Sequence, residues 1–457
     1  MKLISLAFKN CCTFVTMQNS ENKIEKVLQK LGIEALNEMQ LAAITACKSE
    51  QDVVLLSPTG SGKTLAFLLP LLSSFDPTIT NVQALILAPS RELAQQIESV
   101  FKSLGSGFKV NCCYGGHPIN VEKKNLSEPP ALLIGTPGRI VDHLERGSFD
   151  PRDVKTLILD EFDKSLEFGF QEEMSTAIQF LHGLKKRILT SATEAVDIPA
   201  FAGVTSPIRL NYLGESKQVQ GLTIQVVRSP EKDKLDTLYS LICHLGGHPT
   251  LVFCNFREAV ERVGDYLAEN SIANEMFHGG LEQRDRERSL SKFRNGSCNV
   301  FVSTDLAARG LDIPDIKYII HYHLPVNEEA FIHRNGRTAR MKAEGTSFLL
   351  LNKDEETPIY FKKEPDIFEI PVRVPAPASP LWITLYIGKG KKDKLSKMDI
   401  AGFLLKKGNL QKDEVGIIEV KDFFAYVAVK REKVNELLRT IRDEKIKGMK
   451  TKIEISD

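Results

Sequence analysis

The residues best suited to chemistry lie in the run Ser57-Pro58-Thr59-Gly60-Ser61-Gly62-Lys63-Thr64. This run follows the apolar segment 53–56, which predicts a buried strand, and precedes an apolar segment that predicts the start of a helix. A glycine-rich turn in that position brings backbone N–H groups and the positive end of the helix close to an anion. Lys63 can reach the β- and γ-phosphates of a nucleotide, and the Thr64 hydroxyl can bind Mg²⁺. We therefore predict a phosphate-binding loop rather than an ordinary flexible turn.

A second candidate site is the pair Asp160-Glu161, which stands directly after the apolar run 156–159. The first carboxylate can hold Mg²⁺ opposite Thr64, and the second can polarise an attacking water molecule. Acids are also favoured at the start of any helix, because the helix dipole attracts negative charge there. The phosphate loop upstream makes the catalytic interpretation the stronger one.

These residues need a scaffold that brings strand ends together, and the chain predicts one. From the phosphate loop to residue 210, short apolar strands alternate with amphipathic helices, which is typical of a parallel sheet covered on both faces. Ligands bind beyond the carboxyl ends of such strands, where this chain places Pro89 to Ala94, Tyr114 to Gly116, Thr136 to Arg139, Asp160 to Asp163 and Ser191 to Thr193. Residues 218–364 repeat the α/β pattern without a phosphate loop. There, Arg337 and Arg340 are predicted to share one helix face, which can serve a triphosphate or simply be a solvated basic face.

Residues 365–379 are rich in proline and predict an extended linker before a third unit. Residues 380–457 predict the order β-α-β-β-α-β of a ferredoxin-like or RNA-recognition fold. One face of its sheet carries the aromatic side chains Trp382, Tyr386, Phe424 and Tyr426. Aromatic side chains on an open sheet stack on bases, but they can equally pack a core or a neighbouring domain.

Composition locates a basic tail but excludes few functions. The chain has 457 residues, enough for two to four domains, and a net charge of +1. Residues 380–457 carry 18 Lys+Arg against 12 Asp+Glu, a net of +6, and the remainder carries 42 against 47, a net of −5. A basic module on a mildly acidic body favours contact with nucleic acid, although a solvated surface can have the same charge.

The cysteines and apolar runs suggest neither a metal site nor a membrane contact. Eight cysteines occur without Cys-x-x-Cys spacing, so we expect no zinc site and reduced thiols in the cytoplasm. No apolar run approaches the length of a membrane span, and the stretch 4–8 is too short for a signal sequence. We expect translation to start either at Met1 or at Met17, and in the second case residues 1–16 are an upstream extension.

Taken in order, the motifs resemble those of the DEAD-box ATP-dependent RNA helicases over nearly all of residues 32–364. The matching pieces are Gln40, residues 57–64, Pro89 to Ala94, Gly115-Gly116, Thr136 to Arg139, Asp160 to Asp163, Ser191 to Thr193, Gln283-x-x-Arg286, residues 303–312 and His333 to Arg340. The tail is similar to the DbpA-type RNA-binding domain of bacterial helicases, through Gly390-Lys391-Lys392-Asp393 and Phe424-Ala425-Tyr426-Val427.

The resemblance implies two RecA-like domains with ATP and Mg²⁺ between them and RNA across both. The expected parts are an N-terminal extension (1–20), a first RecA-like domain (21–213), a second (218–364), a linker (365–379) and an RRM-like domain (380–457). The ATP site would comprise Gln40 for adenine, Thr59, Gly60, Ser61, Gly62, Lys63 and Thr64 for phosphates, Asp312 for ribose, Thr64 and Asp160 for Mg²⁺, Glu161 for the attacking water, and Arg337 and Arg340 as arginine fingers. Asp163, Ser191 and Thr193 would couple this site to domain closure. RNA would contact Arg91, Gly116, Thr136, Arg139, Arg286, Thr304, Lys391, Lys392 and Tyr426.

The sequence departs from the family pattern at a few positions. Phe162 replaces the usual Ala of the name motif, and we expect activity to survive because Phe162 touches no required chemical group. Ala339 replaces the usual Gly of the arginine motif, and unusual residues precede Gln40. The upstream aromatic that would stack on adenine is Phe14, which is lost if translation starts at Met17.

The resemblance leaves more than one function open. The first is a monomeric helicase that remodels structured RNA, with ribosomal RNA during ribosome assembly as the expected target. The alternatives are an ATP-dependent RNA clamp with little turnover, a general remodeller in RNA decay or cold adaptation, and a DNA translocase. The intact Lys63, Glu161, Arg337 and Arg340 argue against the clamp, and dependence of the ATPase on the RNA 2′-OH would exclude the translocase.

Overall fold

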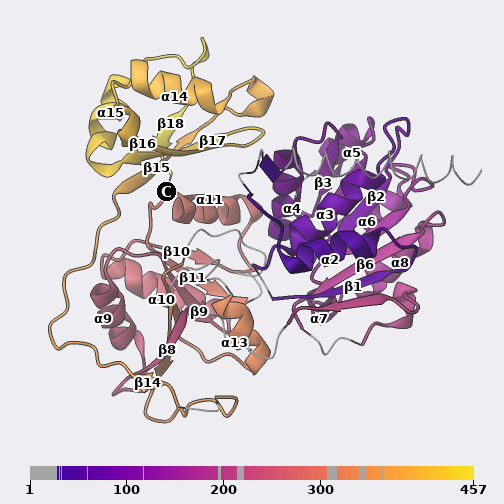
Figure 1. Cartoon of the computed structure of the whole chain (residues 1–457). Coiled ribbons are helices and arrows are strands. Elements are labelled where there is room, and N and C mark those ends of the chain that lie inside the picture. Colours follow the sequence, from indigo (N-terminus) through magenta and orange to yellow (C-terminus); the bar gives the residue numbers. More distant parts are fainter. Residues whose placement is uncertain are drawn as a thin grey trace, which may run out of the picture. The chain divides into compact units, whose positions relative to one another are not determined.

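The computed structural model describes residues 28–29, 31, 33–58, 60–116, 118–193, 197–213, 221–305, 316–336, 338, 345–361 and 364–456. The chain divides into two compact units after residue 217, and Figure 1 labels their elements. Each unit is built on a seven-stranded sheet, and the second also carries a four-stranded sheet. Among the described helices, none combines the length and apolar character needed to cross a bilayer.

The first unit is a parallel α/β sheet with the strand order β3-β4-β2-β5-β6-β1-β7. Its strands are β1 (Val53–Leu56), β2 (Ala84–Leu87), β3 (Val110–Cys113), β4 (Leu132–Gly135), β5 (Thr156–Leu159), β6 (Lys186–Ser191) and β7 (Ile208–Asn211). Its helices are α2 (Glu38–Cys47), α3 (Lys63–Ser74), α4 (Arg91–Leu104), α5 (Ile119–Leu126), α6 (Pro137–Glu145), α7 (Phe162–Glu167) and α8 (Gln171–Phe180).

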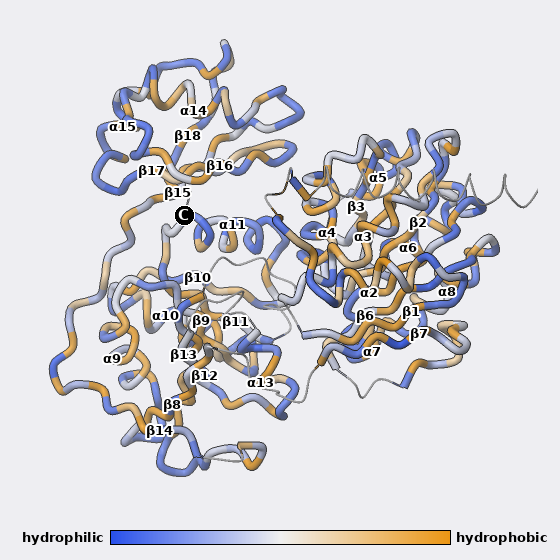
Figure 2. Tube along the Cα trace, viewed as in Figure 1, coloured by the Kyte–Doolittle hydropathy of each residue, from blue (hydrophilic) through white to orange (hydrophobic). Residues whose placement is uncertain are grey.

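Burial on both faces explains why the central strands are continuously apolar. Successive residues point to opposite faces of the sheet. Val53 therefore packs in one core with Ile86, whereas Val54 packs in the other core with Leu85. Figure 2 shows the apolar strands inside the unit and helices of mixed polarity around them.

The second unit repeats this architecture with the parallel order β10-β11-β9-β12-β13-β8-β14. Its strands are β8 (Leu222–Arg228), β9 (Thr250–Cys254), β10 (Asn274–Phe277), β11 (Val300–Thr304), β12 (Tyr318–His321), β13 (Gly345–Leu351) and β14 (Asp366–Ile367). Its helices are α9 (Leu235–Leu245), α10 (Arg257–Glu269), α11 (Gln283–Arg294) and α13 (Glu328–Asn335). The short strand β14 falls inside the predicted linker and pairs with β8, because Phe368 beyond it packs against His244 and Phe348.

The C-terminal module has an antiparallel sheet of order β16-β17-β15-β18. Its elements are β15 (Trp382–Ile387), α14 (Lys397–Lys406), β16 (Val415–Val420), β17 (Ala425–Lys430), α15 (Val434–Thr440) and β18 (Ile453–Ile455), which confirms the predicted β-α-β-β-α-β order. Leu385 and Val427 pack with Leu404 and Leu437 in one core, so α14 and α15 cover one face of the sheet. Trp382, Thr384 and Tyr386 alternate with these core positions on β15 and lie on the other face.

Candidate active site

The predicted phosphate loop joins β1 to α3, and its carbonyl groups bind the side chain of Lys63. Gly60 and Gly62 have positive φ angles of 81° and 90°, which side chains with a Cβ rarely adopt. The buried Lys63 Nζ donates to the carbonyl oxygens of Ser57 (2.5 Å) and Pro58 (2.9 Å). An incoming phosphate would compete with these carbonyls for the ammonium.

Gln40 connects α2 to this loop. Its Oε1 accepts from the backbone N–H of Asn37, whose side chain accepts from the backbone N–H of Gln40, so the pair forms a capping box at the start of α2. Gln40 Nε2 donates to the Gly62 carbonyl at 3.3 Å, and Asn37 Nδ2 donates to the Ser61 carbonyl at 3.0 Å. A Cβ at Gly62 would lie 2.5 Å from Gln40 Nε2. The unusual residue Asn37 thus braces the loop, and adenine contact by Gln40 stays a prediction.

The acid pair follows β5, as predicted, and a threonine that sequence reasoning missed holds it. Thr190 on β6 donates its hydroxyl to Asp160 Oδ1 at 2.5 Å and accepts from the Glu161 backbone N–H at 3.1 Å. Glu161 adopts a left-handed conformation, with φ 46° and ψ 53°. Burial, and then the charge of Glu161, raises the pKa of Asp160 to about 6, while Lys63 is near enough to lower it. The fold therefore brings the acid pair and the phosphate loop together.

The predicted coupling residues also meet. Thr193 Oγ1 donates to Asp163 Oδ2 at 3.4 Å, and Ser191 Oγ donates to the Thr193 carbonyl at 2.8 Å. The Thr193 backbone N–H returns a hydrogen bond to Ser191 Oγ at 3.0 Å. The link from Asp163 to Ser191 therefore runs through Thr193.

Three of the predicted RNA contacts in the first unit follow adjacent strands, and the fourth lies in the first turn of α6. Arg91 begins α4 after β2, Gly116 follows β3 with φ 95°, and Thr136 precedes α6 after β4. A Cβ at Gly115 would lie 3.2 Å from Arg91 Nη2, so that glycine leaves room for the guanidinium. Arg139 on α6 is bonded to the buried Glu122 of α5 at 3.1 Å. The sheet thus brings these residues to the side where the carboxyl ends of β2, β3 and β4 lie.

In the second unit, a buried arginine is the organising group that sequence reasoning missed. Arg334 is 1% exposed, and its guanidinium is bonded to both carboxylate oxygens of Asp305 at 2.5 and 2.7 Å. It also donates to the His323 carbonyl and to Asn255 Oδ1. These bonds join the segment after β11 to α13, and the Asp305–Arg334 pairing was not readable from the spacing of the two motifs.

Several predicted residues lie outside the part of the chain that the structure describes. Helix α13 ends at Asn335, before Gly336, and the helix face predicted for Arg337 and Arg340 falls outside the described residues. Gly336 is the kind of residue that follows a helix end, which was the signal available in the sequence. Outside the described residues lie Phe14, Met17, Thr59, Asp312, Arg337, Ala339 and Arg340.

Comparison with known proteins identifies the family. Three family models match in succession: DEAD/DEAH box helicase over residues 37–199, helicase conserved C-terminal domain over 233–342, and DbpA RNA binding domain over 384–455. ATP-dependent RNA helicase DbpA of Escherichia coli (strain K12) is 31% identical over 441 residues, which cover 94% of this chain and 96% of that protein.

The chain belongs to the DEAD-box ATP-dependent RNA helicases of the DbpA type. DbpA of Bacillus subtilis (strain 168) is 28% identical over 94% of this chain and 96% of its own length. A solved structure of S. cerevisiae Dbp5 bound to RNA and ADP BeF3 matches with a TM-score of 0.64 and 25% identity over 72% of this chain and 87% of that chain. The predicted fold class, two RecA-like parallel sheets and a small RRM-like domain, is confirmed, as is ATP-dependent helicase activity.

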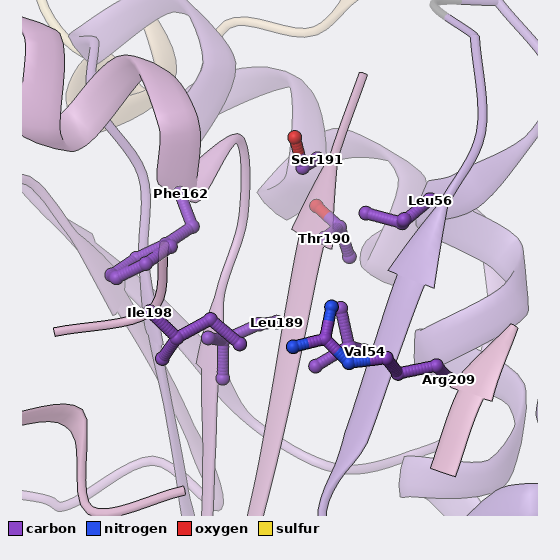
Figure 3. A pocket seen from close by; sticks show the side chains of 8 residues that line it. All are labelled: Val54, Leu56, Phe162, Leu189, Thr190, Ser191, Ile198 and Arg209. Carbon is purple, nitrogen blue, oxygen red and sulfur yellow. The ribbon is translucent and has the colours of Figure 1, made fainter. Parts of the chain in front are cut away.

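In this helicase, the phenylalanine of the name motif is part of the core. Phe162 is 1% exposed, and its ring lies beside Ile198 and Leu189 (Figure 3), with its centroid 6.5 Å from that of Phe201. The cavity that it lines has a volume of about 10 Å³, enough for one water molecule and too small for a ligand. The larger side chain is therefore accommodated by packing against the segment that follows Ser191.

The aromatic face of the helicase's C-terminal sheet is covered by α11, so the predicted stacking of a base on Tyr426 is corrected. Tyr426 and Thr384 are each 1% exposed, and burial raises the pKa of Tyr426 to about 12. Thr384 Oγ1 is bonded to Ser297 Oγ (2.7 Å), Glu419 accepts from Ser291 Oγ (2.8 Å), and Arg284 lies over the Tyr386 ring. The predicted tail contacts Lys391 and Lys392 are exposed and stay predictions.

Proposed function

We propose that this helicase uses ATP and Mg²⁺ to remodel structured RNA, and that its target is ribosomal RNA during ribosome assembly. The observation that carries the proposal is the DbpA RNA binding domain that follows the two helicase domains. A module of this type after the helicase domains would deliver the helicase to one class of structured RNA. We further propose that it acts as a monomer in the cytoplasm, where its six described free cysteines would remain reduced.

In the proposed ATP site, Lys63 and the N–H groups of residues 59–64 hold the phosphates. Thr64 and Asp160 offer Mg²⁺ the hard oxygen ligands that it prefers. Glu161 activates the attacking water, Gln40 and Asp312 recognise adenosine, and Arg337 and Arg340 stabilise the charge that develops during phosphoryl transfer. The buried Asp160 and the neighbouring ammonium of Lys63 support this assignment.

In the proposed cycle, RNA contacts Arg91, Gly116, Thr136 and Arg139 of the first unit and Arg286 and Thr304 of the second. ATP and a bent RNA strand both favour the closed arrangement of the two units, so each raises the affinity for the other. A bent strand no longer fits a duplex, and the complementary strand dissociates. Hydrolysis then reopens the helicase, with Asp163, Ser191 and Thr193 relaying the change.

The test is the ATPase rate of the full chain, measured with ribosomal RNA, with RNA that is not ribosomal, with single-stranded DNA and without nucleic acid. Ribosomal RNA should stimulate the rate most, and DNA should not stimulate it. Lys391→Glu combined with Lys392→Glu should raise the ribosomal RNA concentration for half-maximal rate by about tenfold or more, because phosphate contacts dominate RNA affinity. The matched control is Lys406→Glu with Lys445→Glu, two exposed lysines elsewhere on the module.

Two other results would assign a different function. Equal stimulation by every RNA, unaffected by either lysine pair, would indicate a general RNA remodeller. ATP and RNA binding without stimulated turnover would indicate an RNA clamp.

A further inference from the structure

A buried carboxylate, Glu122, lies near the proposed RNA contacts that follow the carboxyl ends of the strands of the first sheet. It lies in the first turn of α5, and its side chain is 7% exposed. Oε2 accepts from Arg139 Nη1 at 3.1 Å and lies 2.9 Å from His143 Nε2. Oε1 accepts from the backbone N–H of Tyr114 at 3.1 Å. Glu122 thus ties α6 to the turn that follows β3 and carries Gly116.

We propose that Glu122 is a positioning residue that holds the Arg139 guanidinium in the orientation that receives an RNA phosphate. The inference rests on the proposed function, because the contact of Arg139 with RNA is itself proposed. Its physical basis is preorganisation: an arginine fixed before RNA arrives loses less freedom when it binds. The guanidinium has five N–H donors in a planar fork, a geometry that suits a phosphate as well as a carboxylate.

Of the described partners of the Glu122 carboxylate, Arg139 and His143, the arginine is the one that carries its charge at every pH. A buried carboxylate requires a compensating positive charge. Burial, and then the charge of Glu122, raises the pKa of the neighbouring Cys113 thiol, so this group stays neutral and does not compete for the guanidinium. Arg139 is half-buried, with 13% of its side chain exposed, so it is both anchored and reachable.

Glu122→Gln separates positioning from simple electrostatics, because the two effects have opposite signs. Removing a negative charge beside a polyanion site should strengthen RNA binding through the long-range field. Loss of positioning should instead weaken it, because the amide keeps an acceptor for the Tyr114 N–H but no longer holds a charged guanidinium. The matched control is Glu98→Gln on α4, which removes an equal charge paired with Lys102 at 2.8 Å.

The experiment measures the Kd of a labelled oligouridylate for the full chain with a non-hydrolysable ATP analogue at several salt concentrations. Glu122→Gln should raise the Kd by about tenfold and Arg139→Ala by at least as much, each lowering the salt slope by about 0.7 for one lost phosphate contact. In the Arg139→Ala background, Glu122→Gln should change the Kd by less than about twofold, because its partner is gone. The KM for ATP should stay unchanged in every variant, and Glu98→Gln should leave the Kd unchanged or lower it slightly, because it removes a charge without touching Arg139.

Three results would overturn the inference. If Arg139→Ala raises the Kd and Glu122→Gln leaves it unchanged or lowers it, positioning is wrong while the RNA contact stands. If Glu122→Gln has its full effect without Arg139, it acts by another route. If Arg139→Ala has no effect, the proposed RNA contact fails and positioning fails with it. If Glu122→Gln lowers the Tm strongly, the experiment uses Glu122→Asp instead. The aspartate keeps the negative charge but is too short to reach Arg139 in the same way, so it should also raise the Kd.

Discussion

Thr190 offers the sharpest test of the active-site geometry, because its hydroxyl bonds to both members of the acid pair. It donates to Asp160 Oδ1 at 2.5 Å and accepts from the Glu161 backbone N–H at 3.1 Å. Thr190→Val keeps the shape of the buried side chain and removes both bonds. We expect the substitution to loosen the carboxylate proposed to hold Mg²⁺ and the backbone that orients Glu161.

The size of the effect follows from the type of bond that is lost. A hydrogen bond to a charged group contributes about 1.5–3 kcal/mol. If this energy is used to orient the metal site, its loss slows ATP hydrolysis by roughly ten- to a hundredfold. The RNA-stimulated ATPase rate, measured over a range of Mg²⁺ concentrations, should show a lower maximal rate and a higher Mg²⁺ concentration for half-maximal rate.

The pH dependence gives an independent check. The pKa of Asp160 is raised to about 6, and the Thr190 hydrogen bond opposes this rise. Because only the ionised carboxylate binds Mg²⁺, activity at low Mg²⁺ should fall as the pH drops through about 6, and in Thr190→Val this fall should begin at a higher pH. The stability of the nucleotide-free protein should depend on pH in the opposite direction to its activity. Because the pKa of Asp160 is higher in the folded than in the unfolded state, this group stabilises the fold fully below the unfolded pKa, and the stabilisation is lost as the pH rises through about 6.

Thr156→Val, at the start of β5, is the matched control and should leave all three quantities unchanged. The reasoning is refuted if Thr190→Val folds normally and retains the wild-type maximal rate, Mg²⁺ dependence and pH profile. In that case the acid pair is held by the backbone alone, and the hydroxyl of Thr190 has no part in catalysis.

Three further predictions follow from buried groups. Phe162→Ala should lower the free energy of unfolding, measured by denaturant unfolding, by about 3–5 kcal/mol, because it leaves a cavity in a packed core. The ATPase rate per folded molecule should stay within about twofold of the wild-type rate. Thr384→Val should lower the free energy of unfolding by about 1–3 kcal/mol, because it leaves Ser297, just after α11, without this partner, and hydrogen exchange in β15 should become faster. Burial raises the pKa of Cys47 to about 11, so near neutral pH its alkylation, followed by mass spectrometry, should be roughly a hundredfold slower than that of free cysteine and should accelerate as the pH rises toward 11.

Sequence reasoning succeeded where function depends on residues adjacent in the chain. Runs such as 53–56 and 157–159 are apolar at every position because both faces of the sheet are covered, and that requirement is visible locally. The phosphate loop and the acid pair follow such runs directly, so their positions at strand ends could be predicted.

It failed where the deciding partner is distant in sequence. Glu122 and Arg139 meet only because α5 and α6 follow neighbouring strands, and no spacing rule marks a glutamate in a short helix as a partner of that arginine. The aromatic stripe containing Tyr426 has the same pattern whether it faces RNA or a helix. Contacts such as those of Glu419 with Ser291 on α11 and of Thr384 with Ser297 just after α11 distinguish the two cases.

Strand order explains why Thr190, rather than a residue near either motif, is the residue that holds the acid pair. Along the chain the phosphate loop comes first, the acid pair second and Thr190 third, but in the sheet β6 lies between β5 and β1. Leu55 of β1 pairs with Thr190, and Leu159 of β5 pairs with Leu189. The strand that ends in Ser191 therefore lies between the strand that precedes the loop and the strand that precedes the acid pair. If Ser191 and Thr193 act as the proposed coupling residues, we expect them to act on the ATP site through this strand end, where the Ser57 backbone N–H of the phosphate loop donates to the Ser191 carbonyl at 3.0 Å.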